Sequence, residues 1–143
     1  MTTKPDSEDA LEIGTIDLLM AHGWNEWANC YGETTQNFPI TQRNSRYEVV
    51  LRHQLMTALN KLNPQLPPDA IAEAAEALTR DRSTMQLPQA NREVYQLLKN
   101  GVRVSYRDRG RQKTDLARVI DWQNPANNHF FLAQQMWITG EVY

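Results

Sequence analysis

The chain of 143 residues contains a single cysteine, Cys30, and that scarcity excludes an internal disulfide. Chains without disulfides are typical of a reducing compartment, so a cytoplasmic location is expected. Cys30 is read as a small apolar filler, with a catalytic nucleophile as the less common alternative. The chain also lacks an apolar run of 18 residues, and its polar, acidic start has no apolar segment of the secretory type. Neither a membrane span nor a signal peptide is therefore expected.

Motifs of several enzyme classes are absent as well. No glycine is followed by lysine, which excludes a phosphate-binding P-loop, and no serine lies in a G-x-S-x-G pattern. The histidines, His22, His53 and His129, are far apart and have no zinc-like spacing with Cys30. No pair of carboxylates has a spacing that demands an acid–base role. The residues alone therefore predict no catalytic site and no metal site.

Charge is distributed unevenly along the chain, although the net charge is only −2. Residues 1–33 carry seven acidic residues and one basic residue, whereas residues 103–118 carry six basic residues and two acidic ones. Like charges packed so closely repel one another, so the basic segment needs either a solvated face or an anionic partner.

Helical periodicity dominates the first two thirds of the chain. The spacing predicts a first helix over residues 8–21, followed at 24–42 by a loop with a short strand or two. A capping box from Ser45 to Glu48 is expected to open a second helix, which Asn63-Pro64 ends. A third helix opens at Pro67-Pro68-Asp69, and a fourth runs from about Gln89 to Lys99, stopped by Asn100-Gly101.

The period changes to two after Gly101. Residues 102–107 alternate between apolar and polar, Asp108-Arg109-Gly110 forms a turn, and further strands are expected at 116–122 and 130–138. The predicted fold class is α+β, in one domain over 1–143: an acidic helix and irregular segment (1–44), a helical part (45–100) and a β part with an antiparallel hairpin (101–143).

The candidate nucleic-acid-binding residues are those at one end of this hairpin. They are Arg107, Arg109, Arg111 and Lys113. Such side chains can grip phosphates, and each phosphate neutralised adds about 0.9 to the salt slope of duplex binding. The alternative, which the sequence favours, is a charged turn that keeps the hairpin soluble and blocks edge-to-edge pairing.

Two further features have a structural and a functional reading. The segment Asn124-Pro125-Ala126-Asn127-Asn128 is read as a connecting turn, with a ligand-binding loop as the alternative. Glu48 is read as a helix cap, with an acidic metal ligand as the alternative.

Several patterned segments resemble one protein family. Residues 46–64, RYEVVLRHQLMTALNKLNP, resemble the helix ending in LNP near the start of the R subunit of type I restriction–modification enzymes. The run from residue 100 to 141 resembles that subunit's GV-x-V-x-Y strand, its V-x-[LV]-I-D-[FW]-x-N-P-x-N-N-x-[FW] strand and turn, and the strand that follows. The matching positions are Gly101, Val102, Val104, Tyr106, Val119, Ile120, Asp121, Trp122, Asn124, Pro125, Asn127, Asn128 and Phe130. The resemblance covers about residues 8–143.

The resemblance implies the incomplete first half of a PD-(D/E)xK nuclease domain. In that domain an Asp on one strand and a Glu-x-Lys on the next bind Mg²⁺ for phosphodiester hydrolysis. Both are expected after the position of Tyr143, so no catalytic residue is assigned and the chain alone is expected to be inactive. For the complete subunit the resemblance implies Mg²⁺, ATP, DNA, and methylation (M) and specificity (S) subunits as partners.

Three hypotheses follow for the chain. The first is this N-terminal portion of an R subunit, the second a DNA-binding module that uses the basic hairpin, and the third a scaffold that docks partner subunits through apolar helices. If the chain is cut beside an unpaired strand, Phe130–Ile138 is expected to be an exposed edge that favours self-association.

Overall fold

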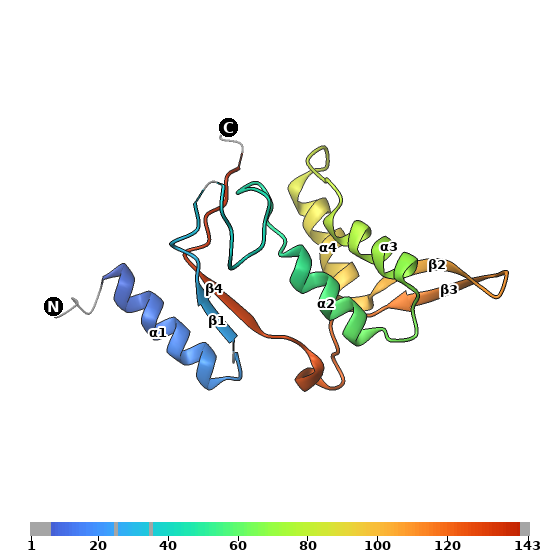
Figure 1. Cartoon of the computed structure of the whole chain (residues 1–143), viewed down its shortest axis with the longest axis horizontal. Coiled ribbons are helices and arrows are strands. Elements are labelled where there is room, and N and C mark those ends of the chain that lie inside the picture. The colour runs from blue at the N-terminus through green and yellow to red at the C-terminus, as the bar shows by residue number, and fades with distance from the viewer. Residues whose placement is uncertain (1–6, 25, 35, 141–143) are drawn as a thin grey trace. The chain divides into compact units, whose positions relative to one another are not determined.

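The computed structural model describes residues 7–24, 26–34 and 36–140 of the chain (Figure 1). The protein is α+β, as predicted, and these residues contain four α-helices, four strands and one short 3-10 helix. They form two compact units. The first consists of the chain up to Val49 together with His129 onwards, and the second runs from Val50 to Asn128. No helix within the described residues is long and apolar enough to cross a membrane.

The first unit contains a helix and a small parallel sheet. Helix α1, Glu8–Ala21, has the predicted bounds, and its first turn is capped by the Ser7 hydroxyl, which accepts a bond from the Ala10 amide. Strand β1, Glu26–Asn29, pairs in parallel with strand β4, Phe131–Gln134. The two strands of this sheet are separated in sequence by the whole of the second unit.

This parallel pairing bears on two expectations about the end of the chain. The predicted strand over 130–138 is reduced to β4, and its partner is β1 rather than the hairpin. Within the described residues β4 is hydrogen-bonded to β1 and half-buried, but this sheet has only two strands, so the other side of β4 has no strand partner. The self-association expected of Phe130–Ile138 therefore stays a prediction. A parallel partner about a hundred residues away leaves no local mark in the sequence.

The second unit begins with three helices: α2 (Arg52–Leu62), α3 (Pro68–Thr79) and α4 (Leu87–Asn100). Their number and ends agree with the prediction, but α2 starts seven residues after Ser45. The capping box is therefore wrong. The Glu48 carboxylate does reach back, but it accepts bonds from the amide and the side chain of Asn44, and so closes a loop before the helix.

An antiparallel hairpin follows α4. Strand β2, Val102–Asp108, pairs with strand β3, Arg111–Ala117, across a two-residue turn. Both turn residues, Arg109 and Gly110, have positive φ, which suits the right-handed twist of the flanking strands. The predicted second strand at 116–122 is wrong. Only its first two residues pair, and the chain then turns through the 3-10 helix η1, Pro125–Asn127.

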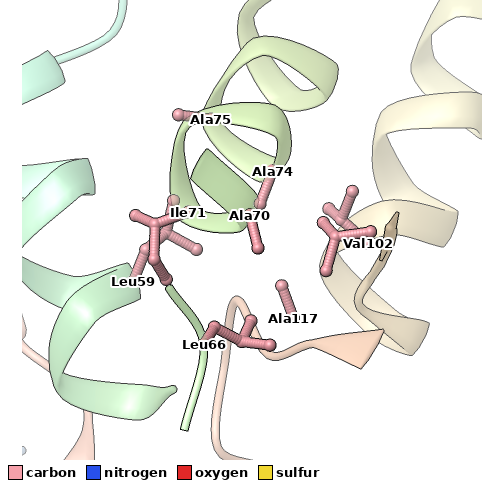
Figure 2. Packing of buried hydrophobic residues seen from close by; sticks show 9 residues of the cluster. Leu59, Leu66, Ala70, Ile71, Ala74, Ala75, Val102 and Ala117 are labelled. Atoms are coloured by element: carbon pink, nitrogen blue, oxygen red, sulfur yellow. The ribbon is translucent and has the colours of Figure 1, made fainter. Parts of the chain in front are cut away.

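The hydrophobic core of the second unit lies between α2, α3 and the hairpin. Figure 2 shows Ala70 and Ala74 of α3 on the side of Val102 and Ala117, with Ile71 towards Leu59 of α2. All six are buried. Small alanine side chains let the backbone of α3 approach the hairpin closely, which fixes the base of the hairpin and leaves its far end in solvent.

Candidate nucleic-acid interface

The four predicted phosphate-binding residues all lie in the outer half of the β2–β3 hairpin. Arg107 lies near the end of β2, Arg109 is in the turn, and Arg111 and Lys113 are in β3. All four side chains are exposed. The structure therefore brings them to one end of the hairpin, as expected, and none of the four side chains is buried in the core.

The register of the hairpin divides these residues between two faces. Cross-strand partners share a face, and Tyr106 is paired with Lys113, Asp108 with Arg111, and Arg107 with Gln112. Lys113 and Arg111 therefore project from the side that packs on α3 nearer the base, whereas Arg107 projects from the opposite, fully exposed side. Sequence spacing did not reveal that the basic residues cannot all meet one flat ligand.

The two faces also differ in their charge. On the packed side, Asp108 forms an ion pair with Lys113, and this partner raises the pKa of the lysine above its usual value. Part of the charge on that side is thereby compensated. On the opposite side, Arg107 shares the face with Arg103, which lies closer to the base, and the residues between them, Ser105 and Thr114, are uncharged. The Glu73 carboxylate of α3 accepts a bond from the Ser105 amide at 3.1 Å and is the acidic group beside this face. This second face is a positive and polar track.

Asp121 is a buried residue to which the sequence analysis assigned no role in a site. It is 7% exposed, and its carboxylate accepts bonds from the Asn127 side chain and from the amides of Gln123 and Asn124. The Asn128 side chain bonds the amide and the carbonyl of Asp121 at 2.8 and 3.0 Å. The asparagine-rich segment is thus a connector built around one carboxylate, which agrees with the structural reading of it.

Asn63 plays a comparable part at the end of α2. Its side chain is buried, donates to the carbonyl of Arg118 at 2.9 Å and accepts from the Arg118 amide at 2.7 Å. An amide side chain thus completes the backbone hydrogen bonds where β3 ends. This contact occupies the backbone of Arg118 directly after β3, so the apolar residues Val119, Ile120 and Trp122 do not extend the strand.

The first unit holds a buried ion pair instead of a catalytic constellation. Glu33 and Arg43 are 4% and 5% exposed, and Nη2 of Arg43 lies 3.6 Å from Oε2 of Glu33. The Glu33 carboxylate also accepts bonds from Ile40 and Thr41, and Nη1 of Arg43 donates to the carbonyls of Glu48 and Trp137. The pair therefore ties the loop at 30–48 to the segment after β4.

Cys30 lies beside this pair and is fully buried. Burial raises the pKa of its thiol, and the negative charge of Glu33 raises it further. Both effects favour the unreactive protonated form, so the structure supports the filler role over the nucleophile. Over residues 7–140, leaving aside 25 and 35, no three of His, Cys, Asp and Glu gather closely enough to hold a metal ion.

Comparison with known proteins gives these features a context. The family model for the N terminus of the type I restriction enzyme R protein matches residues 6–142. The chain belongs to this family. The resemblance of this chain to the N-terminal part of R subunits is thereby confirmed.

Two relatives give the extent of the similarity. The region is 33% identical over 136 residues to the type I restriction enzyme HindI endonuclease subunit of Haemophilus influenzae, covering 92% of this chain and 12% of that protein. It is 25% identical over 95 residues to the putative type I restriction enzyme MjaIXP endonuclease subunit of Methanocaldococcus jannaschii, covering 66% and 9%. The chain thus spans about a tenth of the length of these relatives. No solved structure matches it.

A pH dependence is expected from Asp121 in this R-protein N-terminal region. The bond from the Asn127 side chain and those from the amides of Asn124 and Gln123 hold the pKa of Asp121 below its usual value. Because the folded pKa is the lower one, the stabilisation is complete above the unfolded value of about 3.9 and is lost as pH falls through the folded pKa. We expect the difference in unfolding free energy between wild type and Asp121→Asn to be largest near neutral pH and to shrink below about pH 4.

Urea denaturation at a series of pH values measures that difference directly. Asn127→Ala removes the first of the donors and is expected to show the same trend with a smaller amplitude. A difference that stays constant from pH 7 to pH 3 would contradict the assignment.

Proposed function

We propose that this chain is the N-terminal region of the DNA-cleaving R subunit of a type I restriction enzyme, and that it contributes DNA contacts and scaffolding instead of catalytic groups. The observation that carries the proposal is the family match over residues 6–142, together with two relatives that are endonuclease subunits. On this proposal the complete subunit works in the cytoplasm, uses Mg²⁺ and ATP, translocates along DNA, and assembles with M and S subunits. The resemblance of this part to the first half of a PD-(D/E)xK nuclease domain belongs to the same proposal.

The outer half of the hairpin is the part of the chain best suited to a duplex. Arg109 in the turn and the neighbouring Arg107 and Arg111 are exposed, whereas the fourth basic residue, Lys113, is paired with the carboxylate of Asp108. Guanidinium groups form forked bonds to phosphate oxygens, so these arginines are suited to contacts with the DNA backbone. On this proposal the hairpin positions the subunit on DNA through its backbone.

The experiment for this proposal is a salt titration of duplex binding. We expect the chain to bind a fluorescent duplex with an affinity that falls steeply with salt. Arg107→Ala/Arg109→Ala/Arg111→Ala should reduce the slope by about 0.9 for each phosphate that the variant no longer neutralises. A matched control is Arg52→Ala/Lys61→Ala, which removes two exposed charges from α2. Equal effects of the two variants, or binding that does not depend on salt, would contradict the hairpin assignment.

Cleavage assays separate binding from catalysis. We expect no cleavage of DNA by this chain alone with Mg²⁺ and ATP, and cleavage when the complete subunit is combined with M and S subunits. Cleavage by the isolated chain would overturn the non-catalytic role.

A second candidate function, subunit docking, is favoured by the surface of α1. This helix has no fully buried residue, although Leu11, Ile13 and Leu18 are apolar and mostly exposed. Such a surface is suited to a protein interface. Hydrogen exchange with and without the M and S subunits tests this role, and unchanged protection of residues 8–21 in the complex would remove it.

A further inference from the structure

An exposed groove in the second unit lies beside the C-terminal half of α4. It has a volume of about 490 Å³ and is lined by Tyr95, Leu98, Lys99, Asn100, Ile120 and Trp122. A second cavity of about 230 Å³ shares its last four residues and continues past Gly101 to Leu116 and Arg118. The two together lead from α4 to the base of the hairpin.

Two aromatic rings border this groove and remain open to solvent. Tyr95 is 58% exposed and Trp122 is 62% exposed, whereas Leu98 and Ile120 are half-buried and provide an apolar floor. Aromatic side chains bury a large area when they find a partner, so two exposed rings at one groove mark a surface suited to a flat ligand.

Positive charge surrounds the same groove. The Lys99 ammonium lies 6.0 Å from the centre of the Tyr95 ring, and Arg118 lines the smaller cavity. Arg103 is the cross-strand partner of Leu116, another lining residue, and therefore projects beside it. The one acidic lining residue is Asp121, whose carboxylate is engaged by Asn127 and the amides of its own loop.

The positive track on the exposed face of the hairpin extends this pattern away from the groove. Arg103 and Arg107 lie on that face four residues apart, a distance of about 13 Å at 3.3 Å per strand residue. A ligand that follows both arginines and reaches the aromatic rings must be extended and negatively charged along its length. A single-stranded nucleic acid has this form, with bases to stack and a phosphate at every step. A compact acidic peptide matches the charge of the groove but not the track.

We propose that this groove binds unpaired bases of a single-stranded nucleic acid: Trp122 and Tyr95 stack on bases, while Lys99, Arg118 and Arg103 contact the phosphates. The site shares Arg107 of the track with the hairpin end proposed for duplex DNA, but its stacking rings, Tyr95 and Trp122, lie outside the hairpin. Stacking tolerates any base, because every base has a π-face, so the site is not expected to select a sequence.

The test compares three fluorescent probes of equal length: oligo-dT, the same strand with every base replaced by an abasic site, and a duplex. We expect the chain to bind oligo-dT more tightly than the abasic strand. Trp122→Ala is expected to weaken oligo-dT binding by about 5- to 150-fold, the range for removal of one stacking ring, and to leave duplex binding unchanged. Trp122→Phe keeps a stacking ring and should retain most of the affinity. Tyr47→Ala removes an exposed ring that does not line the groove and should have no effect.

Several results would overturn the proposal. One is equal binding of the oligo-dT and abasic strands. Another is a Trp122→Ala effect that is the same for oligo-dT and duplex. A third combines two observations: the chain does not bind oligo-dT, and a synthetic Glu- and Leu-rich helix quenches the fluorescence of Trp122. Together they would assign the groove to an acidic protein partner. A loss of duplex binding in the hairpin variants tests the proposed function alone, because that experiment measures binding of the duplex probe and not of oligo-dT.

Discussion

Replacing Arg43 with methionine is expected to lower the free energy of unfolding of the first unit by about 3–5 kcal/mol. Methionine is similar in length but carries no charge, so Glu33 is left as an unpaired carboxylate that is only 4% exposed. The carbonyls of Glu48 and Trp137 lose their donor at the same time. Folded domains are stable by only about 5–15 kcal/mol, so a decrease of this size removes much of the margin.

Denaturation in urea, followed by circular dichroism, measures the change. Hydrogen exchange shows where the destabilisation occurs, because the amides of Ile40 and Thr41 bond the Glu33 carboxylate and should lose protection. Arg52→Met is the matched control, because Arg52 is an exposed arginine and its replacement should cost well under 1 kcal/mol. A cost for Arg43→Met close to that of the control would contradict a structural role for the buried pair.

The double variant Glu33→Gln/Arg43→Met distinguishes removal of the pair from removal of one partner. Removing both charges leaves no buried ion unpaired, and buried pairs replaced by neutral groups are often tolerated. We expect the double variant to be more stable than Arg43→Met alone. The coupling energy between the two sites then reports the interaction itself.

The helices of this protein were predictable because their signals are local. The prolines at the start of α3 correctly placed the beginning of this helix. The sequence also predicted a helix stop at Gly101 and a turn at Arg109-Gly110, and all three residues have positive φ. Each of these features is determined by residues within a few positions of one another.

The errors arose where a distant residue decides the local structure. Val119, Ile120 and Trp122 are apolar and the predicted strand includes them, but Asn63, 55 residues before Arg118, binds the backbone of Arg118 where the pairing ends. The polar residues 111–115 fall outside the predicted strands, but the tight turn sets them opposite β2. The pairing of β4 with β1 depends in the same way on a partner about a hundred residues away.

The candidate site was predictable in composition but not in geometry. The sequence showed that basic residues cluster in the hairpin, but only the register shows that Arg107 and Lys113 project from opposite faces. Trp122 falls within a predicted strand, and its exposure beside Tyr95 follows from the turn that Asp121 organises. The residues through which the chain resembles its family, such as Asn63, Asp121 and Asn128, prove to be connectors. Their side chains hydrogen-bond the backbone of the turns after β3.

Gly101→Ala is expected to be the most damaging small substitution in the second unit. Gly101 has φ +85° and ψ 174°, a backbone region open essentially to glycine alone, and forcing another residue into it costs about 1–3 kcal/mol. An added Cβ would also lie 2.7 Å from the carbonyl oxygen of Ala117, which belongs to the first pair of the hairpin. The clash adds to the strain, because the nearest atom is backbone and cannot turn aside.

Gly110→Ala provides the matched control for this effect. Gly110 also has positive φ, +78°, but an added Cβ there meets no atom within 4 Å. Its cost is therefore that of the backbone alone, about 1–2 kcal/mol, and the excess cost of Gly101→Ala reports the clash with Ala117 together with the greater backbone strain at Gly101. Thermal unfolding of both variants gives the comparison. Because Gly101 also lines the smaller cavity beside Leu116, the clash should weaken oligo-dT binding as well, whereas Gly110→Ala should leave it intact. Equal destabilisation by the two variants would show that the base of the hairpin yields to the added methyl group, and would remove the rigid support on which the groove depends.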